Sequence, residues 1–455
     1  MDIVVVTAIL ASLFLIIGLA EPLAARLRLP FSVILAGLGI LIGLAAAFFL
    51  RTELTDALNP VAAAILGLPI RSNVFLYVFL PTLLFQVTLG MNLRRMLDDW
   101  VPILVMAVLA VVVATFAVGY ALFWTGILPL AACLLVGAIV STTDPSAVVG
   151  IFRSIAAPRR LSRLIEGESL LNDAAAIALF GLFIGFVING APEPSIRAAL
   201  ARLPLLVAGG LGVGWVMARA LLWIMAMVPR HELAQISISV ALPYLAYVLA
   251  EQSLGASGVI AVVTAGLTLN LSGPGRLAPR TWNSLREVWD LLAHWAGALI
   301  FVLAALLIPR LLEGAGLREV GVIAVVVAAA IAARAIILFG LLPLLSAMRL
   351  SPQVEAPYRT AILWGGLRGA VTLALALAVT ESLRIPVETR RLVGMLATGF
   401  TLFTLIVQGS SLRWISPDWG WTGCRRWTRP CRGRSWRWRF RPCARTWPGP
   451  PRITN

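Results

Sequence analysis

The amino-acid sequence predicts an all-α polytopic membrane protein. Hydrophobic residues make up 60% of its 455 positions and charged residues only 13%, whereas soluble domains carry about 25% charged residues. The apolar residues also gather in runs of about 20, the length at which a helix spans a bilayer. By this length rule we expect about 13 transmembrane helices.

The candidate spans follow one another along the chain, joined by short polar connections. They lie near residues 2–20, 31–50, 72–90, 101–124, 128–151, 166–189, 203–228, 234–252, 256–271, 288–312, 319–346, 358–380 and 391–411. The first apolar run has no basic region before it, so we expect a retained span and not a cleaved signal peptide.

The arginines of the connecting loops predict the orientation. If the N-terminus lies outside, more loop arginines fall on the inner side than on the outer side, as expected for a membrane protein. We therefore expect a multi-pass protein of the cell (inner) membrane, with its N-terminus outside and its C-terminus cytoplasmic.

The net charge of +16 does not indicate a nucleic-acid partner. Much of it comes from the last segment, because residues 419–455 contain many Arg and no Asp or Glu. We interpret residues 416–455 as a basic, Arg/Trp-rich tail that is disordered or translated out of frame. Three of the four cysteines also lie there, so no disulfide framework or cysteine metal site is implied. We expect no cofactor.

The most polar stretch inside a predicted span is EGESLLND, residues 166–173. Charged groups at bilayer depth are costly, and they mark ion pathways, proton relays or buried ion pairs. On a helix, Ser169 and Asp173 share one face, and Glu168 and Asn172 share the neighbouring face. One helix therefore presents two adjacent polar stripes.

The fifth span is interrupted by Pro145. Proline cannot donate an intrahelical hydrogen bond, and it disfavours helix at the preceding Asp144. We expect residues 142–144 to be unwound, which a membrane protein tolerates only where the backbone is buried or lines a cavity. Asp144 is then placed to offset positive helix ends, and the carbonyl near Thr143 to face a cation.

The twelfth span is interrupted by glycines around Arg368, in the stretch GGLRGA at residues 365–370. It lies seven spans after the fifth, so the two run in opposite directions through the membrane. Paired broken helices of opposite direction are typical of inverted-repeat secondary transporters, with the substrate site near the midplane. A further polar residue, Gln86, interrupts the third span.

Three motifs at these positions, STTDP (141–145), EGESLLND (166–173) and GGLRGA (365–370), resemble those of the monovalent cation/proton antiporters of the NhaP and eukaryotic sodium/proton exchanger family. The resemblance covers roughly residues 1–415. It implies an inverted-repeat antiporter fold with two crossed, interrupted helices, a homodimer in the lipid bilayer, and exchange of Na⁺ (or Li⁺/K⁺) for H⁺.

The family's architecture implies two groups of spans. Residues 101–190 (spans 4–6) and 313–415 (spans 11–13) correspond to a mobile transport core. Residues 1–100 (spans 1–3) and 191–312 (spans 7–10) correspond to a dimerisation and interface domain.

The resemblance also assigns roles residue by residue. Asp173 corresponds to the carboxylate that binds cation and proton alternately, with Ser169 and the Thr143 backbone as further Na⁺ ligands. Asn172 corresponds to a residue that braces the unwound segment. The expected cation- and proton-binding set is Asp173, Ser169, Thr143, Asp144, Asn172 and Gln86.

Glu168 and Arg368 correspond to a structural ion pair between spans 6 and 12. Many family members have Glu where Gln86 stands, so this position departs from the pattern by losing a charge and a proton site. The Asn-Asp order at 172–173 resembles the electroneutral branch of the family, which moves one proton per cation.

Proton and Na⁺ can compete for a single carboxylate, because burial disfavours its charged form and a bound cation favours it. Other functions remain open from the sequence: a K⁺-selective exchanger or channel-like pathway, a transport-dead scaffold or sensor, and an intramembrane aspartyl enzyme using Asp144 and Asp173. The enzyme needs two carboxylates that share a proton and a water, and Pro145 beside Asp144 argues against it. We therefore expect a secondary transporter and no enzyme.

Overall fold

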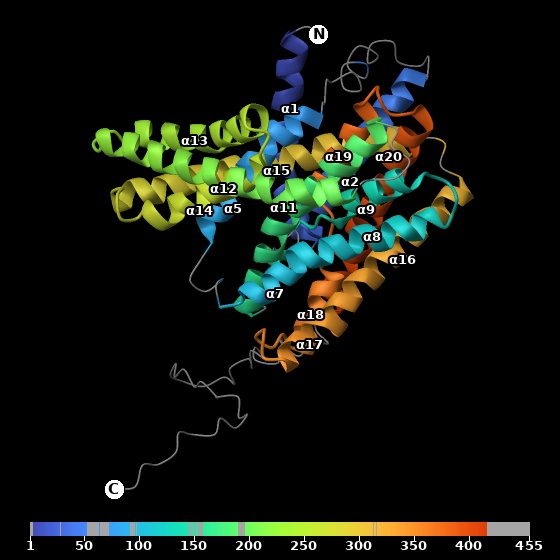
Figure 1. Ribbon diagram of the computed structural model, residues 1–455. Helices are drawn as coiled ribbons and strands as arrows, with labels where there is room; N and C mark the ends of the chain where they lie inside the picture. The colour runs from blue at the N-terminus through green and yellow to red at the C-terminus, as the bar shows by residue number, and fades with distance from the viewer. Residues whose placement is uncertain are drawn as a thin grey trace, which may run out of the picture.

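The protein is described here by a computed structural model. It describes residues 3–27, 29–51, 63, 72–91, 96, 98–144, 148–149, 152, 158–189, 196–312, 314 and 316–415. The regular secondary structure of these residues is entirely helical (Figure 1). Pro145 and the tail 416–455 lie outside the described residues, so the interpretation of the tail stays a prediction.

Nine helical segments in the described part of the chain are long and apolar enough to cross a membrane. They are formed by α1 (Ile3–Leu27), α2 (Phe31–Arg51), α7 (Trp100–Leu104) with η3 (Val105–Leu109) and α8 (Ala110–Phe123), α11 (Arg159–Asn189), α12 (Ile196–Met227), α13 (Glu232–Val248) with η4 (Leu249–Ser253), α15 (Pro279–Leu311), α16 (Leu317–Ala335) with η5 (Ile336–Leu341) and α17 (Leu342–Ala347), and α20 (Val387–Phe403) with η6 (Thr404–Gln408) and α21 (Gly409–Ile415).

The remaining predicted spans contain shorter apolar helices. These are α4 (Ser72–Val74) with η2 (Phe75–Phe79) and α5 (Leu80–Gly90), α9 (Leu130–Ser141), α14 (Gly258–Ser272), and α19 (Ala370–Glu381), which follows α18 (Ala356–Trp364). Each predicted span thus contains at least one described helix, and the all-α polytopic fold is confirmed.

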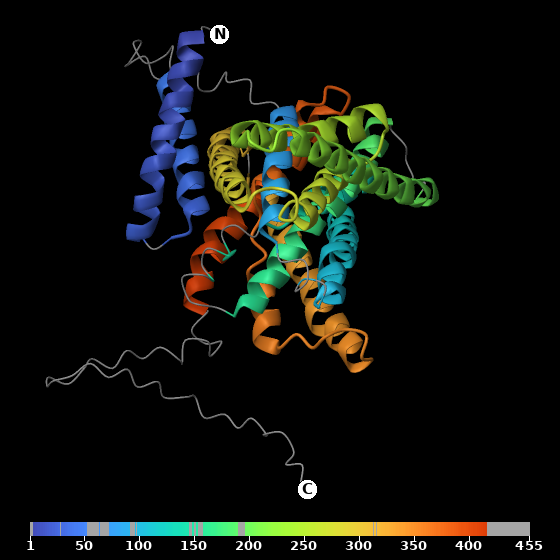
Figure 2. The ribbon, with the colours of Figure 1, turned by 90° about the vertical axis from the view of Figure 1, so that its left-hand side faces the viewer.

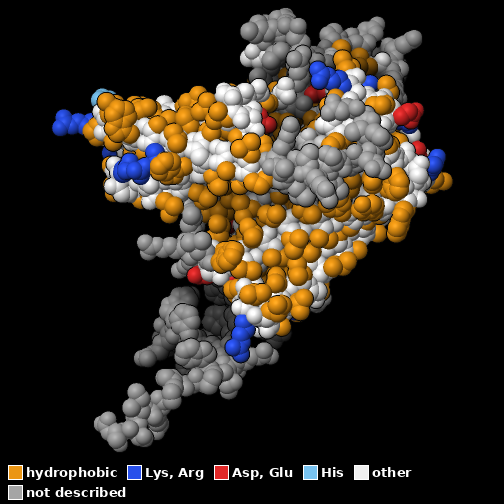
Figure 3. Space-filling view, in the orientation of Figure 1, with side chains coloured by type: hydrophobic (Ala, Val, Ile, Leu, Met, Phe, Trp, Pro, Cys, Tyr) orange, Lys and Arg blue, Asp and Glu red, His pale blue; other side chains and the backbone are white. Residues whose placement is uncertain are grey.

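Large apolar side chains cover much of the outer surface. Leu205, Trp223 and Ile336 are each more than half exposed, and hydrophobic atoms dominate the face in Figure 3. Water would penalise so much exposed apolar surface, whereas lipid tails solvate it. The protein is therefore a multi-pass membrane protein.

The buried apolar residues form separate clusters. One cluster joins α5 with α12, α13, α14 and α15, and it includes Leu170 and Ala174 of α11. Another joins α8, α9, α11, α16, α19 and α20, and Figures 1 and 2 show these two groups as neighbouring bodies. Apart from its two α11 residues, the first group belongs to spans 3 and 7–10, and the second group belongs to spans 4–6 and 11–13. The motion of one group against the other stays a prediction.

Candidate functional site

Two helices break in the middle of the protein. α9 ends at Ser141 because Thr142 adopts an extended backbone conformation, with φ −62° and ψ 147°. α18 ends at Trp364, and the backbone from 365 to 369 is not helical before α19 begins at Ala370. Both interruptions lie where the sequence predicted them.

The two breaks are hydrogen-bonded to each other. The Asp144 amide donates to the Leu367 carbonyl over 2.8 Å. The hydroxyls of Thr142 and Thr372 lie 2.6 Å apart, and both are buried. These contacts satisfy backbone and side-chain groups that would otherwise be unpaired inside the protein. The predicted crossing of two interrupted helices is thus observed.

Arg368 holds the end of α9. Its Nη1 atom donates to the Ser141 carbonyl over 3.1 Å and also to the Thr142 carbonyl. Its guanidinium lies over the Phe400 ring, 5.3 Å from the ring centre. The last carbonyls of a helix carry partial negative charge, so the arginine neutralises the broken end of α9.

Asp144 lies at the other break, against the start of α19. Its side chain occupies the space that a Cβ atom would need at Gly369, the residue that precedes the first turn of α19. The N-terminal end of a helix carries partial positive charge, so the carboxylate is placed to offset it. Only glycine at 369 leaves room for this approach.

The structure corrects the predicted partner of Glu168. Its carboxylate Oε1 lies 2.7 Å from Nη2 of Arg334 on α16, whereas the prediction paired it with Arg368. Arg368 is directed to the α9 carbonyls instead, and Arg334 also donates from Nε to the Ile362 carbonyl over 3.1 Å. The ion pair therefore joins α11 to α16 and to the end of α18.

Sequence reasoning missed Arg334 although a signal was present. It stands alone as a charge within the apolar stretch VVVAAAIAARAIILF of the eleventh span. A charge at membrane depth needs a partner of opposite sign, and Glu168 is that partner.

The α9 break is also held from α11. Ser169 Oγ donates to the Thr143 carbonyl over 2.7 Å, and Asn172 Nδ2 donates to the Thr143 hydroxyl. The structure thus brings Asn172, Ser169 and Thr143 together. The roles assigned to these residues in cation binding stay predictions.

Asp173 lies one turn beyond Ser169 and is 8% exposed. Its Oδ1 atom is buried and has no hydrogen-bond partner among the described residues. Asp173 lines a cavity of about 960 Å³ together with Ser169, Thr143, Asp144 and Gln86. A buried carboxylate oxygen without a partner is costly, so a ligand that supplies positive charge or a proton is favoured there.

Gln86 is hydrogen-bonded to Asp290, a residue that the sequence analysis did not single out. Its Nε2 atom donates to Oδ1 of Asp290 on α15 over 2.8 Å. Asp290 is separated from Gln86 by 204 residues and lies in the polar first half of α15. No pattern in the sequence links the two positions.

The described residues include no group of three or more His, Cys, Asp and Glu side chains arranged to hold a metal ion. A cation in this cavity would instead meet carboxylate, hydroxyl and carbonyl oxygens. Alkali cations are hard ions that accept such a mixed oxygen set.

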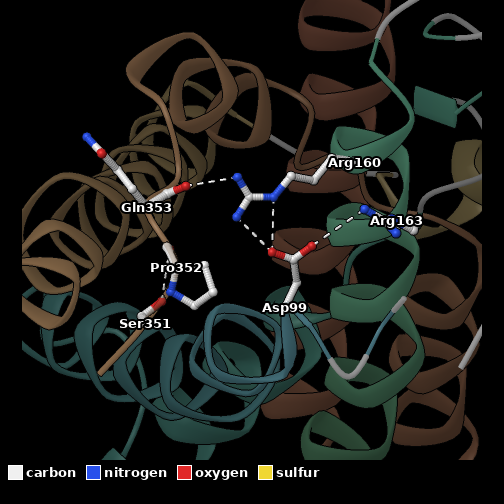
Figure 4. A network of polar contacts seen from close by, with 6 residues as sticks. All are labelled: Asp99, Arg160, Arg163, Ser351, Pro352 and Gln353. Atoms are coloured by element: carbon white, nitrogen blue, oxygen red, sulfur yellow. Dashed lines mark hydrogen bonds and ion pairs between the residues drawn. The ribbon is translucent and has the colours of Figure 1, made fainter. Parts of the chain in front are cut away.

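A separate charged network lies away from the cavity (Figure 4). Asp99, which precedes α7, accepts from Arg160 over 2.7 Å and lies 3.7 Å from Arg163. Arg160 also donates to the Gln353 carbonyl over 2.9 Å. The network ties the starts of α7 and α11 to the segment before α18, and it joins elements of spans 4, 6 and 12.

The chain resembles known antiporters in sequence. The chain is 33% identical over 357 residues to the Na(+)/H(+) antiporter ApNhaP of Aphanothece halophytica, covering 78% of this chain and 66% of that protein. It is 31% identical over 350 residues to the low-affinity Na(+)/H(+) antiporter NhaS1 of Synechocystis, covering 74% of this chain and 63% of that protein. The aligned region thus spans about two thirds of the length of these relatives.

A solved structure shares the fold. The sodium proton antiporter MjNhaP1 from Methanocaldococcus jannaschii aligns with a TM-score of 0.68 and 19% sequence identity, covering 91% of this chain and 99% of that chain. A family profile described as "Sodium/hydrogen exchanger, transmembrane" matches residues 9–416. On the strength of this match, the chain belongs to the sodium/hydrogen exchanger family.

Proposed function

We propose that the protein exchanges Na⁺ (or Li⁺/K⁺) for H⁺ across the membrane, with cation and proton competing for Asp173. The observation that carries this proposal is the buried Oδ1 atom of Asp173 at the cavity wall, which has no hydrogen-bond partner among the described residues. The family membership and the names of the relatives support it.

The competition follows from the surroundings of Asp173. An ionised carboxylate without a partner is unfavourable at this depth, and either a proton or a cation removes the penalty. Ser169 Oγ and the Thr143 carbonyl lie 2.7 Å apart and supply two further oxygen ligands for Na⁺. When the cation binds, the proton leaves, so one carboxylate couples the two fluxes.

Gln86, Asp144 and Asn172 support this site in the proposal. Asn172 holds the Thr143 side chain and thereby the unwound segment. Asp144 balances the start of α19 and adds negative charge to the cavity wall. Gln86 offers a neutral carbonyl oxygen, so Asp173 alone changes its charge in each cycle, with one proton exchanged per cation.

We propose alternating access as the transport step. The transport core, spans 4–6 and 11–13, moves against the interface domain of a homodimer, and it moves only when Asp173 is neutralised by a proton or a cation. The protein acts as a secondary transporter without cofactor and not as an enzyme. It lies in the cell (inner) membrane, with the N-terminus outside and the C-terminus cytoplasmic.

The test is proton flux in proteoliposomes loaded with a pH-sensitive dye. Purified protein is given pulses of Na⁺, Li⁺ and K⁺ at equal concentration, with choline as the non-transported control. We expect Na⁺ to collapse a preset pH gradient without building a membrane potential.

Other results of the flux assay would change or contradict the proposal. A larger response to K⁺ than to Na⁺ changes the preferred cation and leaves the mechanism intact. Cation uptake without proton movement indicates a channel-like pathway and contradicts the proposal. No flux of either ion from correctly folded protein also contradicts it.

A further inference from the structure

One wall of the cavity is formed by α5 and α15, whose side chains meet in register. Phe85 packs against Trp289 with ring centres 4.6 Å apart, and both side chains are fully buried. The next residue of each helix, Gln86 and Asp290, forms the 2.8 Å hydrogen bond. The aromatic contact therefore fixes the position of the polar contact beside it.

The bond to Asp290 sets the orientation of the Gln86 amide. An ionised carboxylate only accepts hydrogen bonds, so the amide nitrogen of Gln86 must face it. The amide oxygen cannot face the same carboxylate, because both atoms are acceptors. The amide oxygen of Gln86 is therefore available to bind a cation at the cavity wall, which Gln86 lines.

The three side chains form a sequence of decreasing exposure. Asp290 is exposed, Gln86 is half-buried, and Asp173 is buried, and all three line the cavity. The cavity wall holds three further acidic residues, Glu21, Asp144 and Glu166, together with one histidine, His294, and no Arg. Low-dielectric walls that carry one sign of charge concentrate ions of the opposite sign.

We propose that Asp290 is a second cation-attracting carboxylate, which sets the affinity for Na⁺ by drawing the ion into the cavity and holding the Gln86 carbonyl oxygen toward it. Asp290 acts before the ion reaches Asp173. It lies on the interface side of the cavity, whereas Asp173 lies on α11. This inference rests on the proposed function, and its test separates the two.

The variant Asp290→Asn removes the charge and keeps an oxygen that accepts from Gln86. We expect the Na⁺ concentration at half-maximal exchange to rise about threefold to tenfold, the effect of one lost charge at partly screened range. The maximal exchange rate should stay within about twofold of that of wild type, because the exchange of ions at Asp173 is unchanged.

A dependence on ionic strength separates attraction from a structural role. Added choline chloride screens exposed charges, so the difference between wild type and Asp290→Asn shrinks as choline rises. Asp290→Glu keeps the negative charge, so its affinity for Na⁺ should lie closer to that of wild type than the affinity of Asp290→Asn does. Asp290→Ala, which also releases Gln86, weakens Na⁺ binding further than Asp290→Asn.

Glu287→Gln is the matched control. Glu287 lies one turn earlier on α15, is exposed, and is not part of the cavity wall. The Glu287→Gln variant removes one negative charge from the same helix, and we expect its half-maximal Na⁺ concentration to equal that of wild type. An equal effect of Glu287→Gln and Asp290→Asn contradicts the inference, as does an Asp290→Asn protein with wild-type half-saturation.

A binding measurement keeps this result independent of transport. Na⁺ raises the melting temperature of the purified protein if it binds the folded state, and the half-maximal Na⁺ concentration of that shift reports affinity. A higher half-maximal Na⁺ concentration for Asp290→Asn supports the inference even if the protein shows no exchange. The lack of exchange would then overturn only the proposed function. Exchange with equal half-maximal values for wild type and Asp290→Asn overturns only the inference.

Discussion

Glu168 and Asp173 lie five residues apart on α11, and both are buried, at 1% and 8% exposure. Their surroundings differ. Glu168 lies 2.7 Å from the Arg334 guanidinium, whereas Oδ1 of Asp173 has no partner among the described residues and belongs to the cavity wall. One carboxylate is neutralised by the protein itself, and the other is left for a ligand.

The comparison shows that burial alone does not identify a transport residue. A buried carboxylate with a fixed guanidinium partner has its charge compensated at all times, so it joins helices. A buried carboxylate that faces a cavity without a partner must take a proton or a cation. We therefore expect the two residues to differ in role although they share a helix.

The largest expected effect is at Asp173, whose Oδ1 atom has no hydrogen-bond partner among the described residues. Asp173→Ala removes the group for which the two ions compete, so Na⁺-dependent proton flux should fall to that of liposomes without protein. The melting temperature should not decrease, because no hydrogen bond to Oδ1 is lost. Retained exchange in this variant would refute the assignment.

The second effect should appear as lost stability. Glu168→Gln leaves Arg334, whose side chain is only 12% exposed, beside a neutral group, and breaking a buried pair costs about 3–5 kcal/mol. Glu168→Gln with Arg334→Gln should be less destabilised than the two single variants added together, which a double-mutant cycle of melting temperatures measures.

The same variants test the contrast between the two carboxylates. The double variant should keep Na⁺-dependent proton flux once it is folded in liposomes. A well-folded Glu168→Gln/Arg334→Gln protein without any exchange would assign Glu168 a direct part in transport.

A smaller effect is expected at Ser169, the neighbouring residue of the proposed cation site. Ser169→Ala removes one hydroxyl oxygen, worth about 1 kcal/mol, and so should raise the half-saturating Na⁺ concentration about fivefold. Ser237→Ala, at an exposed hydroxyl on α13, is the control and should behave as wild type. An unchanged Na⁺ dependence in Ser169→Ala would remove Ser169 from the cation site.

The sequence predicted the helices well because run length and hydropathy depend only on neighbouring residues. It also located both breaks, since Pro145 and the glycines around Arg368 act on the local backbone. The three motifs identified Asp173, Ser169 and Thr143 as candidate site residues, and in the structure all three line one cavity.

The partners of the polar residues could not be predicted in the same way. Two arginines inside predicted spans, Arg334 and Arg368, could have paired with Glu168, and only the packing of α16 against α11 and α18 decides for Arg334. Gln86 meets Asp290 because Phe85 and Trp289 align α5 with α15. Contacts between distant segments depend on how helices pack, which local periodicity does not specify.

The most direct test of the competition at Asp173 is proton release on cation binding. NaCl is added to purified protein in weakly buffered solution, and the pH change is recorded against choline chloride. We expect wild type and the Glu168→Gln/Arg334→Gln protein to release protons and Asp173→Asn to release none. Proton release by Asp173→Asn equal to that of wild type would contradict the account.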